Sequence, residues 1–243
     1  MSVSPKMALV TGGSGILGAA ICRRLGDAGH FVHVHANRRL EEAQTVAREI
    51  VAAGGQARAV AFDVTDTEAA RAVLERLVEE GPIQILVNNA GIHDDAAFPG
   101  MSADQWRRVL DVSVNGFYNV TQPLMLPMIR TRWGRVITLS SVTALIGNRG
   151  QVNYAAAKGA LNAATRSLSL EVASRGITVN AVAPGIITSG MSDAVFDAEA
   201  IAKLVPMKRA GTADEVASLI NYLTSPEAGY ITGQIISVSG GLA

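Results

Sequence analysis

TGGSGILG, residues 11–18, lies between a short apolar run and a helical pattern. Gly13, Gly15 and Gly18 follow the G-x-G-x-x-G spacing of turns that hold a dinucleotide. Glycines let the backbone approach a pyrophosphate, and a helix N-terminus offers free N–H groups and positive potential. Any tight turn can be rich in glycine, but a strand before it and a helix after it favour a nucleotide-binding turn.

The rest of the chain alternates short β-branched runs with longer amphipathic stretches. Runs this apolar are typical of strands buried on both faces of a parallel sheet. We expect strands at residues 7–11, 31–35, 57–62, 83–88, 135–140, 178–183 and 234–238, and helices at about 15–28, 39–53, 67–79, 103–131, 152–175 and 212–224. The pattern predicts an α/β fold: a Rossmann-type, doubly wound parallel sheet of about seven strands with right-handed crossovers.

Composition agrees with one well-buried globular domain over residues 1–243. Hydrophobic residues make up 49% of the chain and charged residues 17%, so disorder is not expected. The formal net charge is zero, which gives no general argument for binding nucleic acid or an anionic membrane. An acidic partner would have to meet a local basic patch.

The single cysteine, Cys22, excludes a disulfide within the chain and fits a reducing compartment. We interpret it as a small buried apolar residue rather than a nucleophile. The N-terminal apolar run is too short for a signal peptide, and no later segment reaches membrane-spanning length. We therefore expect a soluble, cytoplasmic protein, and we expect no metal site.

The end of the second predicted strand bears on the choice of nucleotide. A site for NAD usually has an acidic residue about here to hold the ribose hydroxyls. This chain has Asn37, Arg38 and Arg39 instead. Arginines near a helix start oppose the helix dipole, so a 2′-phosphate on NADP(H) would explain them. The alternative is a solvated helix start balanced by Glu41 and Glu42; we favour NADP over NAD.

Tyr154 and Lys158 stand four residues apart, so on a helix they share one face. An ammonium about 4 Å from a phenolate would stabilise it by about 4 kcal/mol at an effective dielectric of about 20, although desolvation opposes this. Such a tyrosine would exchange protons with an alcohol near neutral pH. Ser141 follows the fifth predicted strand and is placed to bond the same substrate oxygen. The spacing by itself is common on helix surfaces.

Taken together, these motifs resemble the short-chain dehydrogenase/reductase family along essentially the whole chain. The matching elements are the glycine-rich turn, Asp63-Val64, Asn88-Asn89-Ala90-Gly91, Ser141, Tyr154-x-x-x-Lys158 and Pro184-Gly185, in order and spacing. Within the family, the sequence is most similar to 3-oxoacyl-[acyl-carrier-protein] reductases, with a weaker likeness to those of aryl-polyene or polyketide synthesis.

The resemblance implies a role for each matching residue. Tyr154 would be the general acid, Lys158 would lower its pKa and hold the nicotinamide ribose, and Ser141 would orient the substrate carbonyl. A lid over the substrate is expected at about 189–205. Cofactor contacts are expected from Gly12, Ser14, Gly15, Ile16, Leu17, Asn37, Arg38, Asp63, Val64, Asn89, Ala90, Gly91, Tyr154, Lys158, Pro184, Gly185, Ile187 and Thr188.

Two positions depart from the family pattern. The middle glycine of the turn comes one residue early, at Gly15 in place of Ile16, a spacing typical of the extended members that include epimerases. Those members carry a substrate domain about a hundred residues longer, for which this chain has no counterpart. Ser113 stands where the family generally has an asparagine that kinks a helix and holds a relay water, and Asn115 is out of register. We interpret the position as acting mainly through its backbone carbonyl.

Three functional hypotheses follow. The first is an NADPH-dependent reductase of 3-oxoacyl thioesters on an acyl carrier protein, with Arg132 and Arg175 as carrier contacts. The second is the same chemistry on a polyol, sugar or steroid alcohol. The third is a non-catalytic NADP-binding regulatory protein. The long apolar helices and the apolar tail also predict a homo-oligomer, most plainly a homotetramer.

Overall fold

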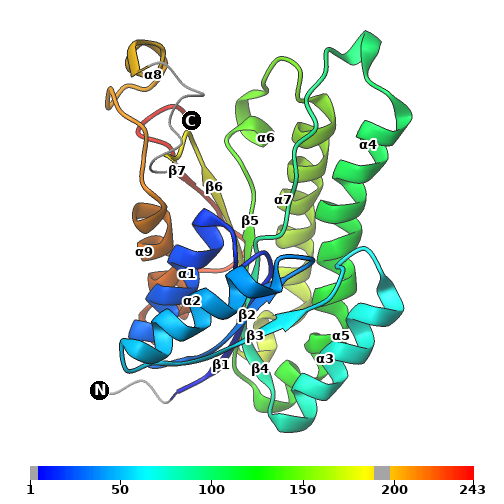
Figure 1. Ribbon diagram of the computed structural model, residues 1–243, viewed down its shortest axis with the longest axis vertical. Helices are drawn as coiled ribbons and strands as arrows, with labels where there is room; N and C mark the ends of the chain where they lie inside the picture. The colour runs from blue at the N-terminus through cyan, green and yellow to red at the C-terminus, as the bar shows by residue number, and fades with distance from the viewer. Residues whose placement is uncertain (1–4, 189–197) are drawn as a thin grey trace.

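The computed structural model describes residues 5–188 and 198–243. A seven-stranded sheet forms the middle layer, with strand order β3-β2-β1-β4-β5-β6-β7 and every pairing parallel (Figure 1). The predicted doubly wound α/β fold is therefore confirmed. The strands are β1 (Met7–Val10), β2 (Phe31–Ala36), β3 (Gln56–Ala61), β4 (Ile83–Asn88), β5 (Gly134–Leu139), β6 (Ile177–Pro184) and β7 (Ile235–Val238).

Helices cover both faces of this sheet (Figure 1). One face carries α1 (Ile16–Asp27), α2 (Leu40–Ala52) and α9 (Ala213–Thr224). The other carries α3 (Thr67–Glu80), α5 (Gly116–Thr131) and α7 (Val152–Val172). Two separate apolar clusters fill the spaces between sheet and helices. Because both faces are covered, β5 and β6 are buried at every residue, which explains why their sequences are mostly apolar and do not alternate.

The predicted helix at 103–131 is a continuous run with a distorted middle. It comprises α4 (Ala103–Leu110), a π-helical turn (Asp111–Asn115) and then α5. Ser102 starts α4 with a capping box, since its hydroxyl accepts from the Gln105 N–H while the Gln105 side chain accepts from the Ser102 N–H. The predicted helix at 152–175 ends as an α-helix at Val172 and continues as a 3₁₀ turn, Ala173–Arg175.

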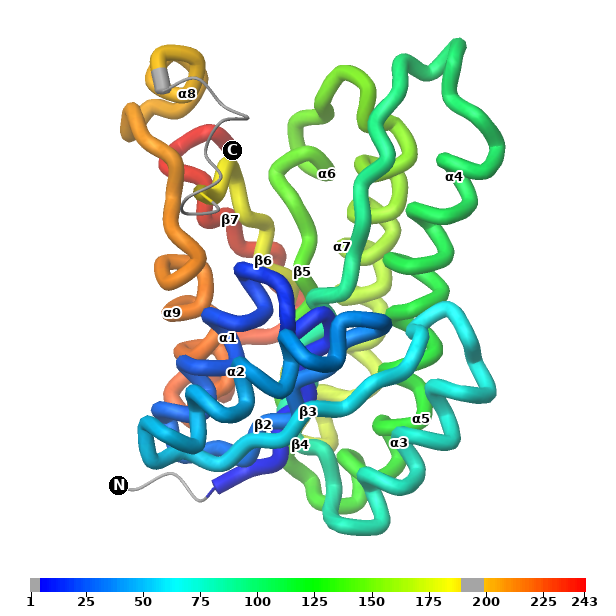
Figure 2. Tube along the Cα trace, in the orientation of Figure 1, coloured from blue at the N-terminus to red at the C-terminus, as the bar shows by residue number. Residues whose placement is uncertain are grey.

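The remaining elements lie around the carboxyl ends of the strands or connect the layers. They are α6 (Thr143–Ile146), α8 (Ala198–Leu204) and the 3₁₀ turns Phe98–Gly100 and Pro226–Ala228. The C-terminal segment returns to this edge beside β6 and α8 (Figure 2), where the Gly240 carbonyl accepts from the Met207 N–H at 3.1 Å. The predicted lid falls partly on α8; residues 189–197 lie outside the described residues. Within the described ranges, no helix has the length and apolar character needed to cross a bilayer.

The sheet order reverses its winding between β1 and β4, which are neighbours although β2 and β3 intervene in the chain. At such a switch point the loops after the two strands leave in opposite directions, and a crevice opens between them. The glycine-rich turn follows β1 and Asn89 follows β4. The topology alone therefore brings both motifs to one crevice at the carboxyl edge.

Three histidines on or next to β2 are buried: His30, His33 and His35. Burial lowers the pKa of His33 and of His35 to about 4, with the Arg58 charge also lowering that of His33. Burial likewise lowers the pKa of His30. These rings are therefore neutral at physiological pH.

Neutral buried histidines predict acid destabilisation. Because the unfolded chain binds these protons near pH 6.5 and the folded chain only near pH 4, the free energy of unfolding should fall as the pH falls through this window. Each of His33 and His35 contributes up to about 3 kcal/mol of this loss. Urea unfolding at pH 7, 5.5 and 4.5 measures it. The variant His33→Gln should lose about a third to a half of the pH dependence, whereas His93→Gln, at an exposed side chain, should retain it; equal slopes in both would contradict the account.

Candidate active site

Two cavities at the carboxyl edge of the sheet form one cleft. The larger, of about 910 Å³, lies over the glycine-rich turn and the ends of β2 and β3. The smaller, of about 330 Å³, lies over the ends of β5 and β6. Both are lined by Leu17, Asn89, Gly91 and Ile92, so they are continuous. A cleft of this size and length accommodates an extended ligand such as a dinucleotide.

The glycine-rich turn is packed too tightly for larger residues at two positions. Gly12 has a φ of 63°, in the left-handed region that favours glycine. A Cβ on Gly18 would overlap the Gly12 carbonyl and come within 2.8 Å of the Gly13 Cα. Gly15 differs, because a Cβ there would meet only the Gly12 carbonyl at 3.5 Å. The shifted middle glycine therefore clears space in the cavity without being required by the packing of the turn.

The N-terminus of α1 opens into this cavity. Gly15 is its N-cap and provides no side-chain hydrogen bond, so no side chain caps the first N–H groups of the helix. Ile16 and Leu17 both line the cavity, and the Ile16 side chain is 54% exposed. Uncapped N–H groups facing a cavity at a helix N-terminus suit an anionic group such as a pyrophosphate.

His35 fixes the glycine-rich turn, a role that sequence patterns did not reveal. Its Nδ1 accepts from the Gly12 N–H at 3.0 Å, and its Nε2 lies 2.9 Å from the Phe62 carbonyl. Because Nδ1 is the acceptor, the ring proton must be on Nε2 and is donated to Phe62. The Gly13 N–H also donates to the His35 carbonyl, at 2.7 Å. The lowered pKa of His35 preserves this neutral arrangement at pH 7.

A second set of bonds connects the glycine-rich turn to the loop after β4. The Thr11 hydroxyl accepts from the N–H groups of Asn89 and Ala90, each at 3.0 Å. The Asn89 amide donates to the carbonyls of Thr11 and Gly12 at 2.9 and 3.1 Å. These bonds join segments almost 80 residues apart in sequence, so the Asn89 motif is a structural part of the cleft floor.

The far end of the larger cavity carries Asn37, Arg38 and Asp63. Hydrogen bonds from Thr65, through its N–H at 2.8 Å and its hydroxyl at 2.7 Å, hold the pKa of Asp63 below its ordinary value. Arg39 forms an ion pair with Glu42 at 2.9 Å, whereas the exposed Arg38 lines the cavity. The end of β2 therefore presents a cation, and the carboxylate that lines the same part of the cavity, Asp63, comes from the loop after β3.

Ser141, Tyr154 and Lys158 all line the smaller cavity. The Lys158 ammonium is buried and donates to the Leu139 carbonyl at 2.7 Å. It lies 5.6 Å from the centroid of the Tyr154 ring. The Ser141 oxygen accepts from the Thr143 N–H at 3.1 Å, and its side chain hydrogen-bonds to Tyr154. Three groups able to donate protons thus surround one small space.

The pKa of Tyr154 shifts in the direction opposite to that expected from its spacing to Lys158. Burial raises the pKa of Tyr154; the Ser141 hydrogen bond lowers it, and the Asp95 carboxylate raises it. Burial lowers the pKa of Lys158 to about 8. Burial of the phenol outweighs the hydrogen bond that lowers its pKa, and the Lys158 ammonium donates to the Leu139 carbonyl. Tyr154 is therefore a protonated phenol at neutral pH.

Ser113 lies at the centre of the π-helical turn. Its side chain is 2% exposed, and its hydroxyl has no hydrogen-bond partner. Asn115 bonds instead to the Asp111 carboxylate at 2.8 Å. A π turn replaces the regular i+4 bonding with i+5 bonding and is frequent at functional sites. The backbone distortion expected of an asparagine is present here with a serine.

The cleft therefore gathers most of the residues expected from sequence. All the expected cofactor residues line it except Thr188, whose N–H donates to the Gly211 carbonyl at 2.9 Å. Residues that line the cleft but were not expected include His35, Thr65, Ile92, His93, Arg108, Asp111 and Val112. Gly18 belongs to the glycine-rich motif but was not among the expected cofactor contacts. Its close packing against Gly12 and Gly13 is what marks it in the structure. Among the described residues, no group of three or more histidine, cysteine, aspartate or glutamate side chains could hold a metal ion.

Known proteins resemble this chain over nearly its full length. The family model described as enoyl-(acyl carrier protein) reductase matches residues 12–243. The chain belongs to the short-chain dehydrogenase/reductase family. The 3-oxoacyl-[acyl-carrier-protein] reductase FabG of Aggregatibacter actinomycetemcomitans is 44% identical, covering 96% of this chain and 98% of the relative. Nodulation protein G of Rhizobium sp. (strain N33) is 43% identical, covering 98% and 97% respectively.

Membership of the short-chain dehydrogenase/reductase family makes this protein an oxidoreductase acting on CH–OH or keto groups with a nicotinamide dinucleotide. The cleft agrees with that cofactor. It is long enough, it starts at an uncapped helix N-terminus, and it ends at the serine, tyrosine and lysine. The residues present therefore fit the group that the family uses.

The π turn predicts that the side chain at Ser113 matters little. Ser113→Asn should change kcat by less than about tenfold, equivalent to about 1.4 kcal/mol of barrier, because the helix is already distorted without an asparagine. Ser113→Ala should behave alike, since the hydroxyl has no partner. Steady-state kinetics of both variants test this. A rise in kcat well beyond tenfold in Ser113→Asn would show instead that the natural serine impairs proton relay.

Proposed function

We propose that this protein reduces a 3-oxoacyl thioester, carried by an acyl carrier protein, to the 3-hydroxyacyl thioester with NADPH. The observation that carries the proposal is one continuous cleft with Ser141, Tyr154 and Lys158 at one end and Arg38 at the other. Relatives called 3-oxoacyl-[acyl-carrier-protein] reductase, at 44% and 40% identity over nearly full length, support the substrate class.

The preference for NADP(H) rests on the end of β2. The strand is followed by Asn37 and Arg38, both exposed and both lining the cavity. A carboxylate here would repel a 2′-phosphate, whereas a guanidinium attracts one and can bind it through two hydrogen bonds. Arg39 is less available because Glu42 neutralises it. Arg38 is thus the residue proposed to recognise the phosphate.

Residues of this chain would divide the chemistry as follows. When bound, the reduced nicotinamide supplies the hydride. Tyr154 Oη, protonated at neutral pH, gives its proton to the substrate carbonyl oxygen as negative charge develops there. Ser141 Oγ, placed by the Thr143 N–H, donates to the same oxygen and orients the carbonyl. Lys158 keeps two further N–H donors besides the one used by Leu139.

The raised pKa of Tyr154 suits the direction of reduction. A general acid must hold its proton at the working pH, and an alkoxide is a far stronger base than a phenolate. Burial and the Asp95 carboxylate both favour the protonated phenol. The reverse reaction, alcohol oxidation, needs the phenolate and would be favoured only at higher pH.

A second candidate keeps the reaction and changes the substrate. Nodulation protein G relatives are nearly as similar as the reductases, at 43% and 40% identity. The alternative is reduction of another ketone, such as a sugar, polyol or steroid. A non-catalytic, NADP-binding regulator is less well supported, because the serine, tyrosine and lysine meet in one cavity. Assay with acetoacetyl thioester against a ketone panel separates the three.

The proposed carrier contacts, Arg132 and Arg175, lie next to each other on the surface. The Arg132 guanidinium donates to the Ser174 carbonyl at 3.3 Å, and both arginines are exposed. They precede β5 and β6, so they lie at the amino edge of the sheet, whereas Tyr154 lies at the carboxyl edge. The helix between Tyr154 and Arg175 spans about 30 Å at about 1.5 Å per residue. Within one subunit, the pair is remote from the site.

A second copy of the chain would bring an arginine pair close to the site of its neighbour. Helices α5 and α7 expose large apolar side chains, including Tyr118, Leu126 and Leu170, the last 84% exposed. Two-fold packing of this face would run the helices of the two copies antiparallel. The arginine pair of one copy would then approach the catalytic edge of the other. We therefore tie carrier binding to a homo-oligomer, for which we propose a homotetramer. The single cysteine, buried and free, is compatible with the cytoplasm as the working compartment.

The catalytic assignment predicts distinct effects of two substitutions. Tyr154→Phe should lower kcat by about 10²- to 10⁴-fold and leave NADPH binding nearly intact, because only the proton donor is lost. Lys158→Ala should weaken both. Absorbance at 340 nm follows turnover with acetoacetyl thioester, and fluorescence titration follows NADPH affinity. Tyr222→Phe, on α9 away from the cleft, is the matched control. Full activity of Tyr154→Phe would refute the mechanism.

The carrier proposal predicts a substrate-dependent defect. Arg132→Glu with Arg175→Glu should raise KM severalfold for a carrier-bound substrate and barely change it for a small thioester, since acidic carriers are attracted electrostatically. The same charge change on α3, Arg71→Glu with Arg76→Glu, should affect neither. Light scattering should give an oligomer at micromolar concentration for all three proteins. A monomer, or equal effects on both substrates, would count against the proposal.

A further inference from the structure

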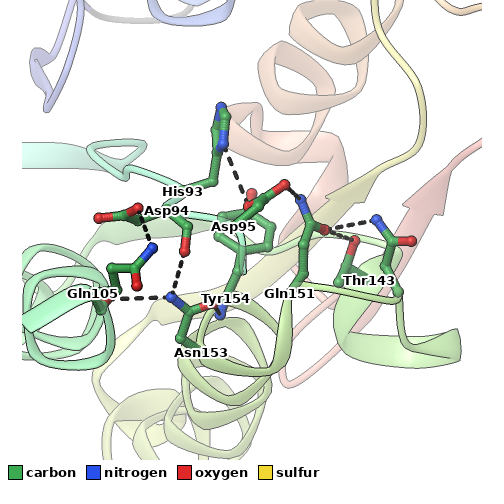
Figure 3. Close-up of polar contacts among 9 residues, drawn as sticks. His93, Asp94, Asp95, Gln105, Thr143, Gln151, Asn153 and Tyr154 are labelled. Atoms are coloured by element: carbon green, nitrogen blue, oxygen red, sulfur yellow. Dashed lines mark hydrogen bonds and ion pairs between the residues drawn. The ribbon is translucent and has the colours of Figure 1, made fainter. Parts of the chain in front are cut away.

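Residues 92–97, the loop after β4, form a wall beside the substrate end of the cleft, which Ile92 and His93 line directly (Figure 3). Several bonds hold this wall. The Asn153 amide donates to the Asp94 carbonyl at 2.9 Å, and the Ala96 N–H donates to the Gly150 carbonyl at 2.9 Å. Asn153 is fully buried and also accepts from the Tyr154 N–H. The wall is therefore fixed directly to the first turn of α7, which carries the catalytic tyrosine.

The two adjacent carboxylates of this wall have different environments. Asp94 accepts from the Gln105 side chain at 3.0 Å and lies 3.6 Å from the Arg108 guanidinium, so it is bound to α4. Asp95 accepts from the Gln151 side chain at 2.8 Å and lies beside Tyr154, whose pKa its charge raises (Figure 3). Only Asp95 is thus electrostatically coupled to the catalytic phenol.

Gln151 fixes the position of the Asp95 carboxylate. Its side-chain oxygen accepts from the Thr143 hydroxyl at 3.2 Å and from the Asn148 amide at 2.9 Å. With its oxygen used in this way, its NH₂ group must face Asp95. The bridge joins the loops after β4 and β5. Asp95 is therefore held at the site by a neutral amide, which bonds to the carboxylate without cancelling its charge.

Two basic residues belong to the described lining of the smaller cavity, and both already have partners. Lys158 is directed to the Leu139 carbonyl, and the other basic residue of that lining, His93, lies 3.5 Å from Asp95 through Nδ1. A substrate carboxylate next to the reacting ketone would have to compete with Asp95 for His93. It would also bring a second negative charge close to the Asp95 carboxylate, whose side chain is 45% exposed.

We propose that Asp95 is a specificity-determining residue that makes this site accept neutral keto esters and thioesters and reject the corresponding keto acid anions. His93, paired with Asp95, is kept from serving as a carboxylate receptor. The proposal deepens the proposed function and rests on it, since it assumes that a ketone binds beside Tyr154. A carrier-bound thioester has no carboxylate near its keto group and meets no repulsion.

The test compares ethyl acetoacetate with acetoacetate, which differ by one negative charge near the same ketone. The variant Asp95→Asn removes the charge but can still accept from Gln151, so a purely structural role would be preserved. The matched control, Asp94→Asn, makes the same change one residue earlier. For each protein, the ratio of kcat/KM for the anion to that for the ester is measured at pH 7 and low ionic strength.

Asp95→Asn should raise this ratio at least tenfold, or about 1.4 kcal/mol, and Asp94→Asn should change it less than threefold. Salt at about 1 M should reduce the gain, because exposed charges are then screened. Equal ratios in the two variants, or a loss of both activities at an unchanged ratio in Asp95→Asn, would overturn the proposal.

Binding measurements test the role of Asp95 independently of the proposed reduction. If the natural enzyme reduces neither the ester nor a thioester, the proposed function fails. The dissociation constants of the ester and the anion, from NMR titration of the NADPH complex, still test Asp95 without turnover. Tenfold tighter anion binding in Asp95→Asn, relative to the ester, would support its role. An unchanged relative affinity would refute it.

Discussion

The proposed catalytic end of the cleft depends on keeping an ammonium group inside a crowded space. Lys158 is 3% exposed, and the Leu139 carbonyl at 2.7 Å and the Tyr154 ring at 5.6 Å are its neighbours there. A Cβ on Gly91 would lie 3.2 Å from the ammonium, so a larger residue would crowd it. Burying a charge without a carboxylate is costly, and the lowered pKa of Lys158 reflects that cost. The surrounding backbone must therefore be placed accurately and firmly.

The backbone around the cleft is held in place by hydrogen bonds between loops rather than within them. Thr11 and Asn89 join the turn after β1 to the loop after β4, and His35 joins the same turn to the ends of β2 and β3. At the substrate end, Gln151 and Asn153 join the loop after β4 to α6 and α7. Each of these loops starts from a buried parallel strand. The sheet thus acts as a rigid base, and a few long-range polar contacts set the shape of the cleft.

Two departures from regular backbone geometry lie beside the cleft. The π turn around Ser113 interrupts a long helix beside α7, and the left-handed Gly12 lies in the glycine-rich turn that lines the larger cavity. Both depart from ideal backbone geometry, and both recur at functional sites in general. The π turn is present with a serine in place of an asparagine, so the distortion does not require an amide side chain.

The sequence by itself determined the layered fold and indicated which residues would take part in the chemistry. Continuous apolar runs predict doubly covered strands, glycine register predicts a close backbone approach, and the four-residue spacing of Tyr154 and Lys158 predicts a shared helix face, because each is a local, periodic property. Only the tertiary structure decided the rest. The tautomer of His35, the direction of the Tyr154 pKa shift and the orientation of Asp95 depend on burial and on bonds to residues distant in sequence. Likewise, Arg132 and Arg175 directly follow α5 and α7 in sequence. They lie at the opposite edge of the sheet from Tyr154, because α7 runs from one edge of the sheet to the other.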